Sequence, residues 1–305
     1  MPNSLKIQLV NRTTSQNVFA FITGLAMQHG MARVFIKADG KGLYYPEAPS
    51  AGKILQPLTE DCAIPLGAPG NTVNVTIPQM AGGRIWFSAE KKLTFLRNPG
   101  GPGGGAALVE PSVLNPSDPN ADVDFTFCEF TLNNDQLFAN ISYVDFVSRL
   151  PIALTLQTKG GAVQHVSGMP SDGLDKVCAG LKAQSAKDGR PWEKLIIQPK
   201  GQDRPLRALN PTHCNAIGAN FDGYFEPLRG CICDVHEHPS GPETFYRCDP
   251  TNHYSRIVHE CNLDGKGYAF AYDDVQPDGG GSEWEGERGD PEVFVVEVGG
   301  GGVCG

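Results

Sequence analysis

The stretch from residue 124 to residue 154, DFTFCEFTLNNDQLFANISYVDFVSRLPIAL, decides how the chain is expected to fold. It contains two apolar, strand-like runs separated by the polar NNDQ, and each run carries one acid, Glu129 or Asp145. Successive side chains of a strand point to opposite faces of the sheet. The face of Glu129 therefore also carries Phe125, Phe127 and Thr131. The opposite face is expected to join the core, and it consists of Thr126, Cys128, Phe130 and Leu132.

The second acid lies in an equally apolar setting. The same alternation groups Asp145 with Ile141 and Tyr143, and places Val144 and Phe146 on the other face. A carboxylate without a partner is costly in such surroundings, so each acid is expected to face a partner or a water-filled cleft. A structural salt bridge and a functional acid both remain open, because buried acids occur in either role.

Composition predicts a mainly β protein that is rich in turns. The chain has 305 residues, 37 of them Gly and 24 Pro, and its 40% hydrophobic content suffices for a core. Residues 4–23 contain two strand-like runs broken by NRTTSQ, a pattern typical of a hairpin. Further short runs follow at 34–37, 42–45, 72–77 and 82–88, so we predict a β-sandwich or barrel.

A second domain is predicted where the strand pattern stops. Residues 171–189 show helical spacing of apolar side chains, with Ser171 placed to cap the helix and Gly189 to end it. A strand at 195–198 and a helix at 254–261 follow in an irregular, Cys-rich region. Strand patterns return at 267–274 and 292–298, and the last strands are expected to rejoin the first sheet. We therefore predict a β domain at 1–166 plus 263–305 and an inserted mixed α/β domain at 167–262.

Charge and hydropathy limit the class of partner. Lys and Arg number 25 and Asp and Glu 34, which gives a net charge of −9 and a pI near 5.3. An acidic chain is a poor partner for nucleic acid or an anionic membrane. No apolar run approaches the roughly 18 residues that a membrane span requires. A neutral ligand and a monomeric protein are expected.

The cysteines favour disulfides and an oxidising compartment. Five of the nine lie between residues 214 and 261, and the C-x-C at 231–233 lacks the paired spacing of a zinc site. An odd number leaves at least one thiol free. Sequons at Asn11, Asn74 and Asn140 are compatible with secretion. No leader is visible at residues 1–3, so either a signal peptide has been removed or the protein is cytoplasmic. The cysteine count favours removal, and we expect a secreted protein.

Two carboxyl groups that flank one bond are the requirement of most glycoside hydrolases. Glu129 and Asp145 are 16 residues apart with a turn at 133–136, so neighbouring strands can present them to one groove. The polar and aromatic side chains nearby suit a sugar, although each could equally be strand or turn packing. They are Thr131, Asn133, Phe138 and Tyr143.

Other chemistries have weaker support in the sequence. His236 and His238 could chelate zinc or copper, but a polar surface loop is the commoner outcome in such an irregular stretch. Asp222 and Glu226 are secondary candidates for lining the cleft from the inserted domain. No G-x-S-x-G elbow is present. We expect neither a metal nor another cofactor.

Several motifs together resemble the thaumatin-like superfamily. They are GRIW at 83–86, EFTL at 129–132, VDF at 144–146 and YAFAYDD at 268–274. The additional ALVEPS at 107–112 and NPSDPN at 115–120 make the chain similar to the β-1,3-glucanases of glycoside hydrolase family 64, typified by laminaripentaose-producing enzymes. The resemblance runs from about residue 4 to the C-terminus.

The resemblance implies a thaumatin-like β domain and a mixed α/β domain, with a wide groove between them for a β-1,3-glucan chain. It assigns Glu129 as general acid and Asp145 as general base of an inverting reaction that releases short laminari-oligosaccharides. Thr131 and Asn133 match glucan contacts, and Phe138 stands where an indole is more usual. The alternative is a thaumatin-like β-glucan-binding or defence protein without catalytic activity.

Overall fold

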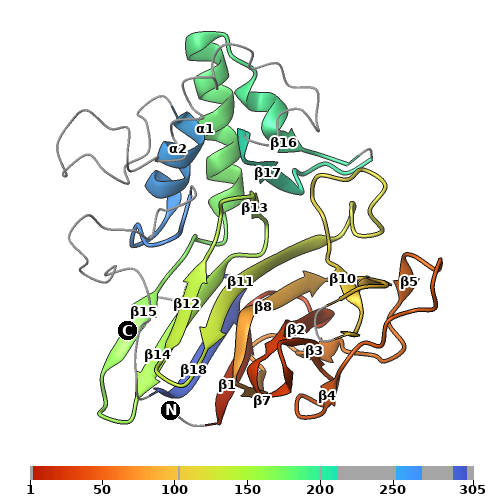
Figure 1. The fold of residues 1–305 in the computed structure, drawn as a ribbon. Coiled ribbons are helices and arrows are strands. Elements are labelled where there is room, and N and C mark those ends of the chain that lie inside the picture. The colour runs from red at the N-terminus through yellow and green to blue at the C-terminus, as the bar shows by residue number, and fades with distance from the viewer. Residues whose placement is uncertain (1–2, 102–103, 200, 212–251, 270–290, 301–305) are drawn as a thin grey trace, which may run out of the picture.

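The computed structural model describes residues 3–101, 104–199, 201–211, 252–269 and 291–300. Two β-sheets pack face to face, and the two α-helices lie beyond one end of them (Figure 1). The larger sheet has the order β12-β11-β8-β2-β3-β4, with β6 also paired to β2. Its strands are β2 (Val18–Ala26), β3 (Ala32–Ile36), β4 (Leu43–Tyr44), β6 (Ile64–Pro65), β8 (Met80–Ala89), β11 (Asp124–Leu132) and β12 (Leu137–Ile141).

The smaller sheet joins the two ends of the described chain. Its order is β15-β14-β18-β1-β7, and β18 runs parallel to β1 and antiparallel to β14. Its strands are β1 (Ser4–Asn11), β7 (Thr72–Pro78), β14 (Ile152–Thr158), β15 (Val163–Val166) and β18 (Pro291–Val298). The strand expected at 292–298 thus returns to the sheet of the first strand, as the sequence suggested.

The expected hairpin of residues 4–23 is wrong. Both strands form, but β1 pairs with β7 and β18 while β2 pairs with β3, β6 and β8. The connection between them therefore crosses from one sheet to the other. Asn11 shapes this crossing, because its amide donates to the carbonyls of Ser15 and Gly67 at 2.8 Å each. Local alternation predicted the strands correctly but could not predict their partners.

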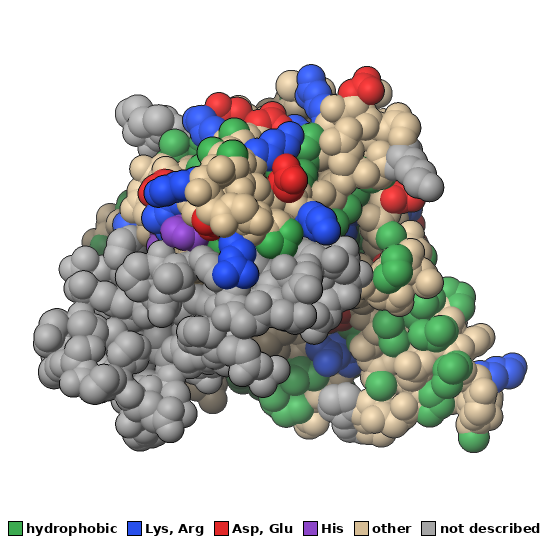
Figure 2. Space-filling model, turned by 90° about the horizontal axis from the view of Figure 1, so that it is seen from above, with side chains coloured by type: hydrophobic (Ala, Val, Ile, Leu, Met, Phe, Trp, Pro, Cys, Tyr) green, Lys and Arg blue, Asp and Glu red, His purple; other side chains and the backbone are tan. Residues whose placement is uncertain are grey.

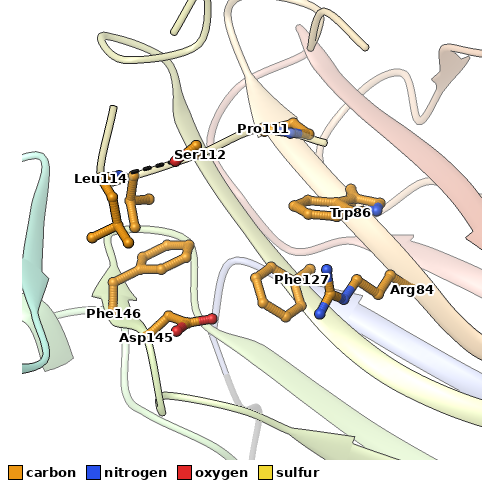
Figure 3. A pocket seen from close by; sticks show the side chains of 9 residues that line it. Arg84, Trp86, Pro111, Ser112, Leu114, Phe127, Asp145 and Phe146 are labelled. Carbon is orange, nitrogen blue, oxygen red and sulfur yellow. Dashed lines mark hydrogen bonds between the residues drawn. The ribbon is translucent and has the colours of Figure 1, made fainter. Parts of the chain in front are cut away.

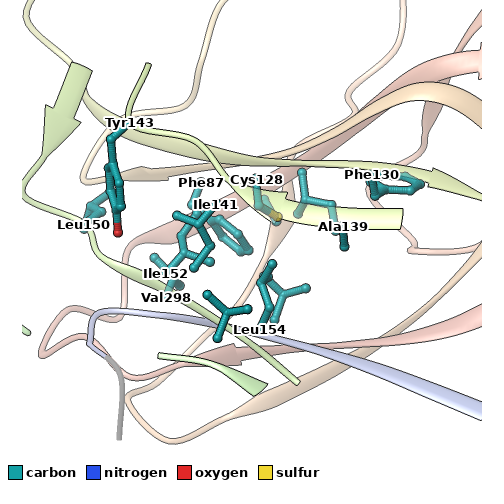
Figure 4. Packing of buried hydrophobic residues seen from close by; sticks show 14 of the residues in the cluster. Phe87, Cys128, Phe130, Ala139, Ile141, Tyr143, Leu150, Ile152, Leu154 and Val298 are labelled. Atoms are coloured by element: carbon teal, nitrogen blue, oxygen red, sulfur yellow. The ribbon is translucent and has the colours of Figure 1, made fainter. Parts of the chain in front are cut away.

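The principal core fills the space between the two sheets. Cys128, Phe130 and Leu132 of β11 lie in it, as the alternation predicted (Figure 4). Leu154 of β14 and Val298 of β18 contribute from the facing sheet. Burying such side chains stabilises the fold by roughly 1.5–3 kcal/mol each. A slip of β11 by one residue would move its buried side chains to the outer face, so their burial fixes its register with the neighbouring strands.

The helical part is attached through a small sheet of its own. Its elements are β13 (Phe146–Ser148), α1 (Gly173–Asp188), η3 (Trp192–Leu195), β16 (Ile196–Ile197), β17 (Arg207–Leu209) and α2 (His253–Cys261). β13 pairs with β17, and β17 pairs with β16. Residues 146–148 therefore pair with a strand of the segment predicted as the inserted domain, although the predicted boundary lay at 166. The exact division into domains stays a prediction.

The two predicted helices form, with one capping residue different from expectation. Gly189 ends α1 in the left-handed conformation at φ 70°, which glycine adopts without strain. The N-cap is Asp172 rather than Ser171, and it makes no side-chain capping bond. The helix expected at 254–261 is α2, whose N-cap Asn252 accepts a hydrogen bond from the backbone N–H of Ser255. Among the described residues, no helix is long and apolar enough to cross a membrane.

A second three-stranded sheet lies against the outer face of the larger sheet. It consists of β5 (Gln56–Pro57), β9 (Leu96–Asn98) and β10 (Ala107–Val109), in the order β10-β9-β5. The short helix η1 (Met27–His29) lies between β2 and β3. An aromatic cluster, which includes Phe95, Trp86 and Phe125, occupies this side of the larger sheet.

The cysteines differ from the predicted disulfide framework. The four that the structure describes are unpaired: Cys62, Cys128, Cys178 and Cys261. Of the cluster at 214–261 on which the prediction was based, only Cys261 is among them, and for that residue the prediction is wrong. Burial, with the charge of Asp175, raises the pKa of Cys178 to about 11, so its thiol stays protonated at neutral pH. The other five cysteines lie outside the described residues.

Candidate active site

The floor of the site is the aromatic outer face of the larger sheet. Trp86 of β8 and Phe127 of β11 lie with their ring centroids 4.8 Å apart, and Phe146 of β13 lies 6.0 Å from Phe127. Tilted and edge-on contacts of this kind are favourable beyond the area that they bury. The Trp86 indole N–H also donates to Thr23 Oγ1 at 3.2 Å. This face is therefore rigid where the acids approach it.

Glu129 lies where burial of this outer face ends. Phe125 and Phe127 are buried, whereas the Glu129 side chain is 36% exposed. In register, Glu129 lies opposite Arg84 of β8 on one side and Asn140 of β12 on the other. Arg84 Nε donates to Glu129 Oε1 at 3.0 Å, and Nη2 lies 3.0 Å from the same oxygen as an ion-pair contact. Within the described residues, Oε2 accepts no hydrogen bond.

Arg84 is shared between two carboxylates. Its Nη1 donates to Glu110 Oε2 at 2.6 Å, a shorter contact than either of those to Glu129. The guanidinium also lies over the Phe127 ring, 4.9 Å from its centroid. Burial lowers the pKa of Arg84, but the charges of Glu110 and then Glu129 outweigh it and raise the pKa overall. Arg84 is therefore a permanent cation at the centre of the site.

Asp145 does not lie in a strand. β12 ends at Ile141 and β13 begins at Phe146, so Asp145 occupies the bend between them. The predicted grouping is therefore wrong for Asp145, which lines the pocket described below, whereas Ile141 and Tyr143 do share one side and lie in the core. The backbone N–H of Asn210, which follows β17, donates to the Asp145 carbonyl at 2.9 Å and holds this bend.

A pocket of about 130 Å³ brings these elements together. In Figure 3 the Asp145 carboxylate points toward Phe127, and Arg84 lies beyond that ring. The wall opposite the sheet is the segment that follows β10. The pocket is lined by Arg84, Trp86, Pro111, Ser112, Val113, Leu114, Phe127, Asp145 and Phe146. Asp145 thus lines the pocket directly, and Glu129 is joined to it through Arg84.

Two of the predicted sugar contacts share the outer face with Glu129. Thr131 is directly opposite Phe138 in the β11–β12 pair, and both side chains are half-buried. Cross-strand pairs project to the same side of a sheet. Asn133 has a structural task in the turn, because its Oδ1 accepts from the backbone N–H groups of Asp135 and Gln136, each at 2.8 Å.

Tyr143 lies elsewhere than expected. Its side chain is 4% exposed and belongs to the core between the sheets, beside Leu150 in Figure 4. Burial raises the pKa of its hydroxyl well above the usual range. The ring lies on the same side as Ile141, two residues earlier, which belongs to this core as well. The structure therefore does not place Tyr143 at the surface where a sugar could reach it.

The remaining candidates lie outside the described residues. They are Asp222, Glu226, His236 and His238. Within the described ranges, no cluster of three His, Cys, Asp or Glu side chains could hold a metal ion. Seen from the helical end, the described surface shows acidic and basic side chains interspersed (Figure 2). A neutral ligand remains compatible with this face.

Sequence reasoning missed three residues of the site, Arg84, Glu110 and Asn140. Arg84 stood inside the GRIW motif and Glu110 inside ALVEPS, so both were visible as motif members without a role. Their role depends on long-range contacts, which bring Arg84 of β8 to Glu129 of β11 across 45 residues and Glu110 to Arg84 across 26 residues. Pairing between strands that are distant in sequence was the missing information.

Comparison with known proteins identifies the family. The sequence model of the β-1,3-glucanases of glycoside hydrolase family 64 matches residues 3–228 and 228–298. The chain belongs to this family. A glucan endo-1,3-β-glucosidase of Cellulosimicrobium cellulans is 24% identical over 311 aligned positions, which cover 74% of this chain and 54% of that protein. The chain thus spans about half the length of this relative.

Solved structures of the family share the fold. A laminaripentaose-producing β-1,3-glucanase in complex with laminaritetraose superposes with a TM-score of 0.77 at 23% identity, covering 97% of this chain and 99% of that one. A family-64 enzyme from Paenibacillus barengoltzii, complexed with laminarihexaose, gives a TM-score of 0.67 at 22% identity, covering 97% and 75%. The mainly β architecture is therefore that of family 64.

Proposed function

We propose that this protein hydrolyses the β-1,3-linkages of a laminarin-type glucan and releases short laminari-oligosaccharides. The observation that carries the proposal is the meeting of Asp145 with the Arg84–Glu129 pair at one aromatic-lined pocket in a family-64 chain. The relatives described as laminaripentaose-producing enzymes, two of them complexed with laminari-oligosaccharides, support this class of substrate.

We assign Glu129 as the general acid and Asp145 as the general base of an inverting reaction. A proton on Glu129 Oε2 passes to the glycosidic oxygen as the bond from that oxygen to C1 breaks. Water attacks C1 from the opposite side and gives its proton to the Asp145 carboxylate. The products are two shorter glucans, one carrying the new reducing end, and the two acids exchange protonation states until solvent restores them.

The outer face of β11 and β12 supplies the proposed sugar contacts. Phe138 offers an apolar ring to a glucose face, and the Thr131 hydroxyl lies beside it. Asn133 can contribute its amide nitrogen, because its carbonyl oxygen is occupied in the turn. We extend the binding surface into the wide groove expected between the β-sheets and the helical part.

Laminarin digestion tests the proposal. We expect new reducing ends and accumulation of short oligosaccharides, with the α-anomer appearing first in ¹H NMR spectra recorded before mutarotation. Initial formation of the β-anomer contradicts inversion. Saturable laminarin binding without new reducing ends contradicts hydrolysis and supports the alternative, a non-catalytic glucan-binding protein.

We also propose that the protein acts outside the cell as a monomer. An extracellular location suits a polymeric substrate that cannot cross a membrane. The sequons support it unequally: the Asn74 side chain is exposed, whereas Asn11 is fully buried and hydrogen-bonded, so a glycan cannot be attached there in the folded state. Detection in the culture medium and sedimentation analysis test these two points.

A further inference from the structure

The cluster formed by Glu110, Arg84 and Glu129 contains one more carboxylate than the proposed reaction uses. Glu110 follows β10, and its side chain is 24% exposed, less than the 36% of Glu129. It takes the shortest hydrogen bond of the cluster, 2.6 Å from Arg84 Nη1. Glu110 is only partly exposed and is hydrogen-bonded to a residue of the site. Solvation of a surface charge therefore does not explain its position.

A general acid beside a permanent cation faces a chemical difficulty. Glu129 must carry a proton at the working pH in order to give it away. A guanidinium at hydrogen-bond distance favours the ionised carboxylate instead. Without another charge nearby, Arg84 would therefore position Glu129 but would also favour loss of the proton that the reaction needs.

The charged groups around Glu129 come from several elements. β8 contributes Arg84 and the segment after β10 contributes Glu110, while the bend before β13 contributes Asp145, whose charge also acts on Arg84. β12 presents the uncharged Asn140 directly opposite Glu129. With Glu110 ionised, its charge offsets that of Arg84, and the negative charge of Asp145 further disfavours ionisation of Glu129.

We propose that Glu110 is a positioning residue that offsets the charge of the guanidinium orienting Glu129, so that Glu129 can take up the proton that it gives to the leaving oxygen. This inference rests on the proposed role of Glu129 as general acid. Arg84 then fixes the position of Glu129 Oε1 through Nε and Nη2. The negative charge of Glu110 offsets the guanidinium charge, which would otherwise favour the ionised form of Glu129. The charge of Glu110 raises the pKa of Arg84 more than the charge of Glu129 does, which agrees with this division of tasks.

The Glu110→Gln variant tests the proposal, because glutamine keeps the shape of the side chain and removes its charge. The observable is the titration midpoint of the Glu129 carboxyl carbon, followed by NMR in protein labelled with ¹³C-glutamate. The signal is assigned by its loss in Glu129→Gln. We expect the midpoint to fall by about one pH unit or more, and the alkaline limb of kcat/KM on laminarin to move down with it.

Glu260→Gln is the matched control. Glu260 also accepts two hydrogen bonds from an arginine, Arg256, at 2.8 and 3.0 Å, but on the exposed face of α2. We expect no change of the Glu129 midpoint in this variant. An unchanged or raised midpoint in Glu110→Gln, or an equal shift in Glu260→Gln, overturns the proposal.

A second variant covers the case in which Glu110→Gln does not fold. Arg84→Gln removes the cation and leaves two carboxylates facing each other, so the Glu129 midpoint must rise, and a fall contradicts the proposal. The NMR measurement needs no turnover. If the variants show the expected shifts but the wild-type protein does not hydrolyse laminarin, the proposed function is refuted. The charge balance around Glu129 is then still established.

Discussion

At the scale of single residues, the site depends on which face of a strand a side chain occupies and on where the strand stops. Alternation along β11 correctly placed Glu129 on the outer face and Cys128 in the core. It failed for Asp145, because the chain leaves β12 at Ile141, whereas Tyr143 shares the core side with Ile141. The backbone N–H of Tyr143 donates to the Tyr268 carbonyl at 2.7 Å, a contact across 125 residues that no local pattern reveals.

The contrast between Phe138 and Tyr143 gives a prediction at this scale. Phe138→Ala removes a half-buried ring from the outer face, and we expect KM for laminarin to rise about fivefold, since a ring contact of this kind contributes about 1 kcal/mol. Tyr143→Phe keeps the packing of a core ring and should leave KM unchanged. Steady-state kinetics on both variants check this. A rise of KM in Tyr143→Phe alone would show that the assignment is reversed.

At the scale of elements, the pairing of β8 with β11 builds the acid site. Gly83 lies opposite Phe130, and a Cβ added at Gly83 would come within 2.5 Å of the Phe130 ring. The register of both β2 and β11 on β8 shifts beside this point, at a β-bulge that ends just before Arg84. The motif GRIW was visible in the sequence, but the reason for its glycine appears only when β11 is laid beside it.

Gly83→Ala should therefore be costly. We expect a loss of about 1–3 kcal/mol in the free energy of unfolding, because the ring of Phe130 must move out of a packed core. Urea denaturation measures the loss. Gly82→Asn is the control, since Gly82 has φ 52° with open space around its Cβ position, and asparagine tolerates that conformation. Equal losses in the two variants would refute the packing explanation.

At the scale of the whole molecule, the pocket forms where the larger sheet, the segment after β10 and the end of β13 meet. β18 closes the smaller sheet between β1 and β14, so the chain returns to its starting sheet after the helical part. The mainly β class, most strands and both helices were predictable from periodicity. Sheet order and the crossing after β1 were not, because they depend on contacts between residues distant in sequence.

The central claim is that Glu129 and Asp145 act as acid and base on one glycosidic bond. The most direct test is the rate at which Glu129→Gln and Asp145→Asn hydrolyse laminarihexaose, compared with the wild type under identical conditions. Both substitutions preserve side-chain shape and remove the titrating group. The account predicts a loss of about 10²-fold or more in kcat for each variant, with circular dichroism unchanged. A near-wild-type rate in either variant would contradict it.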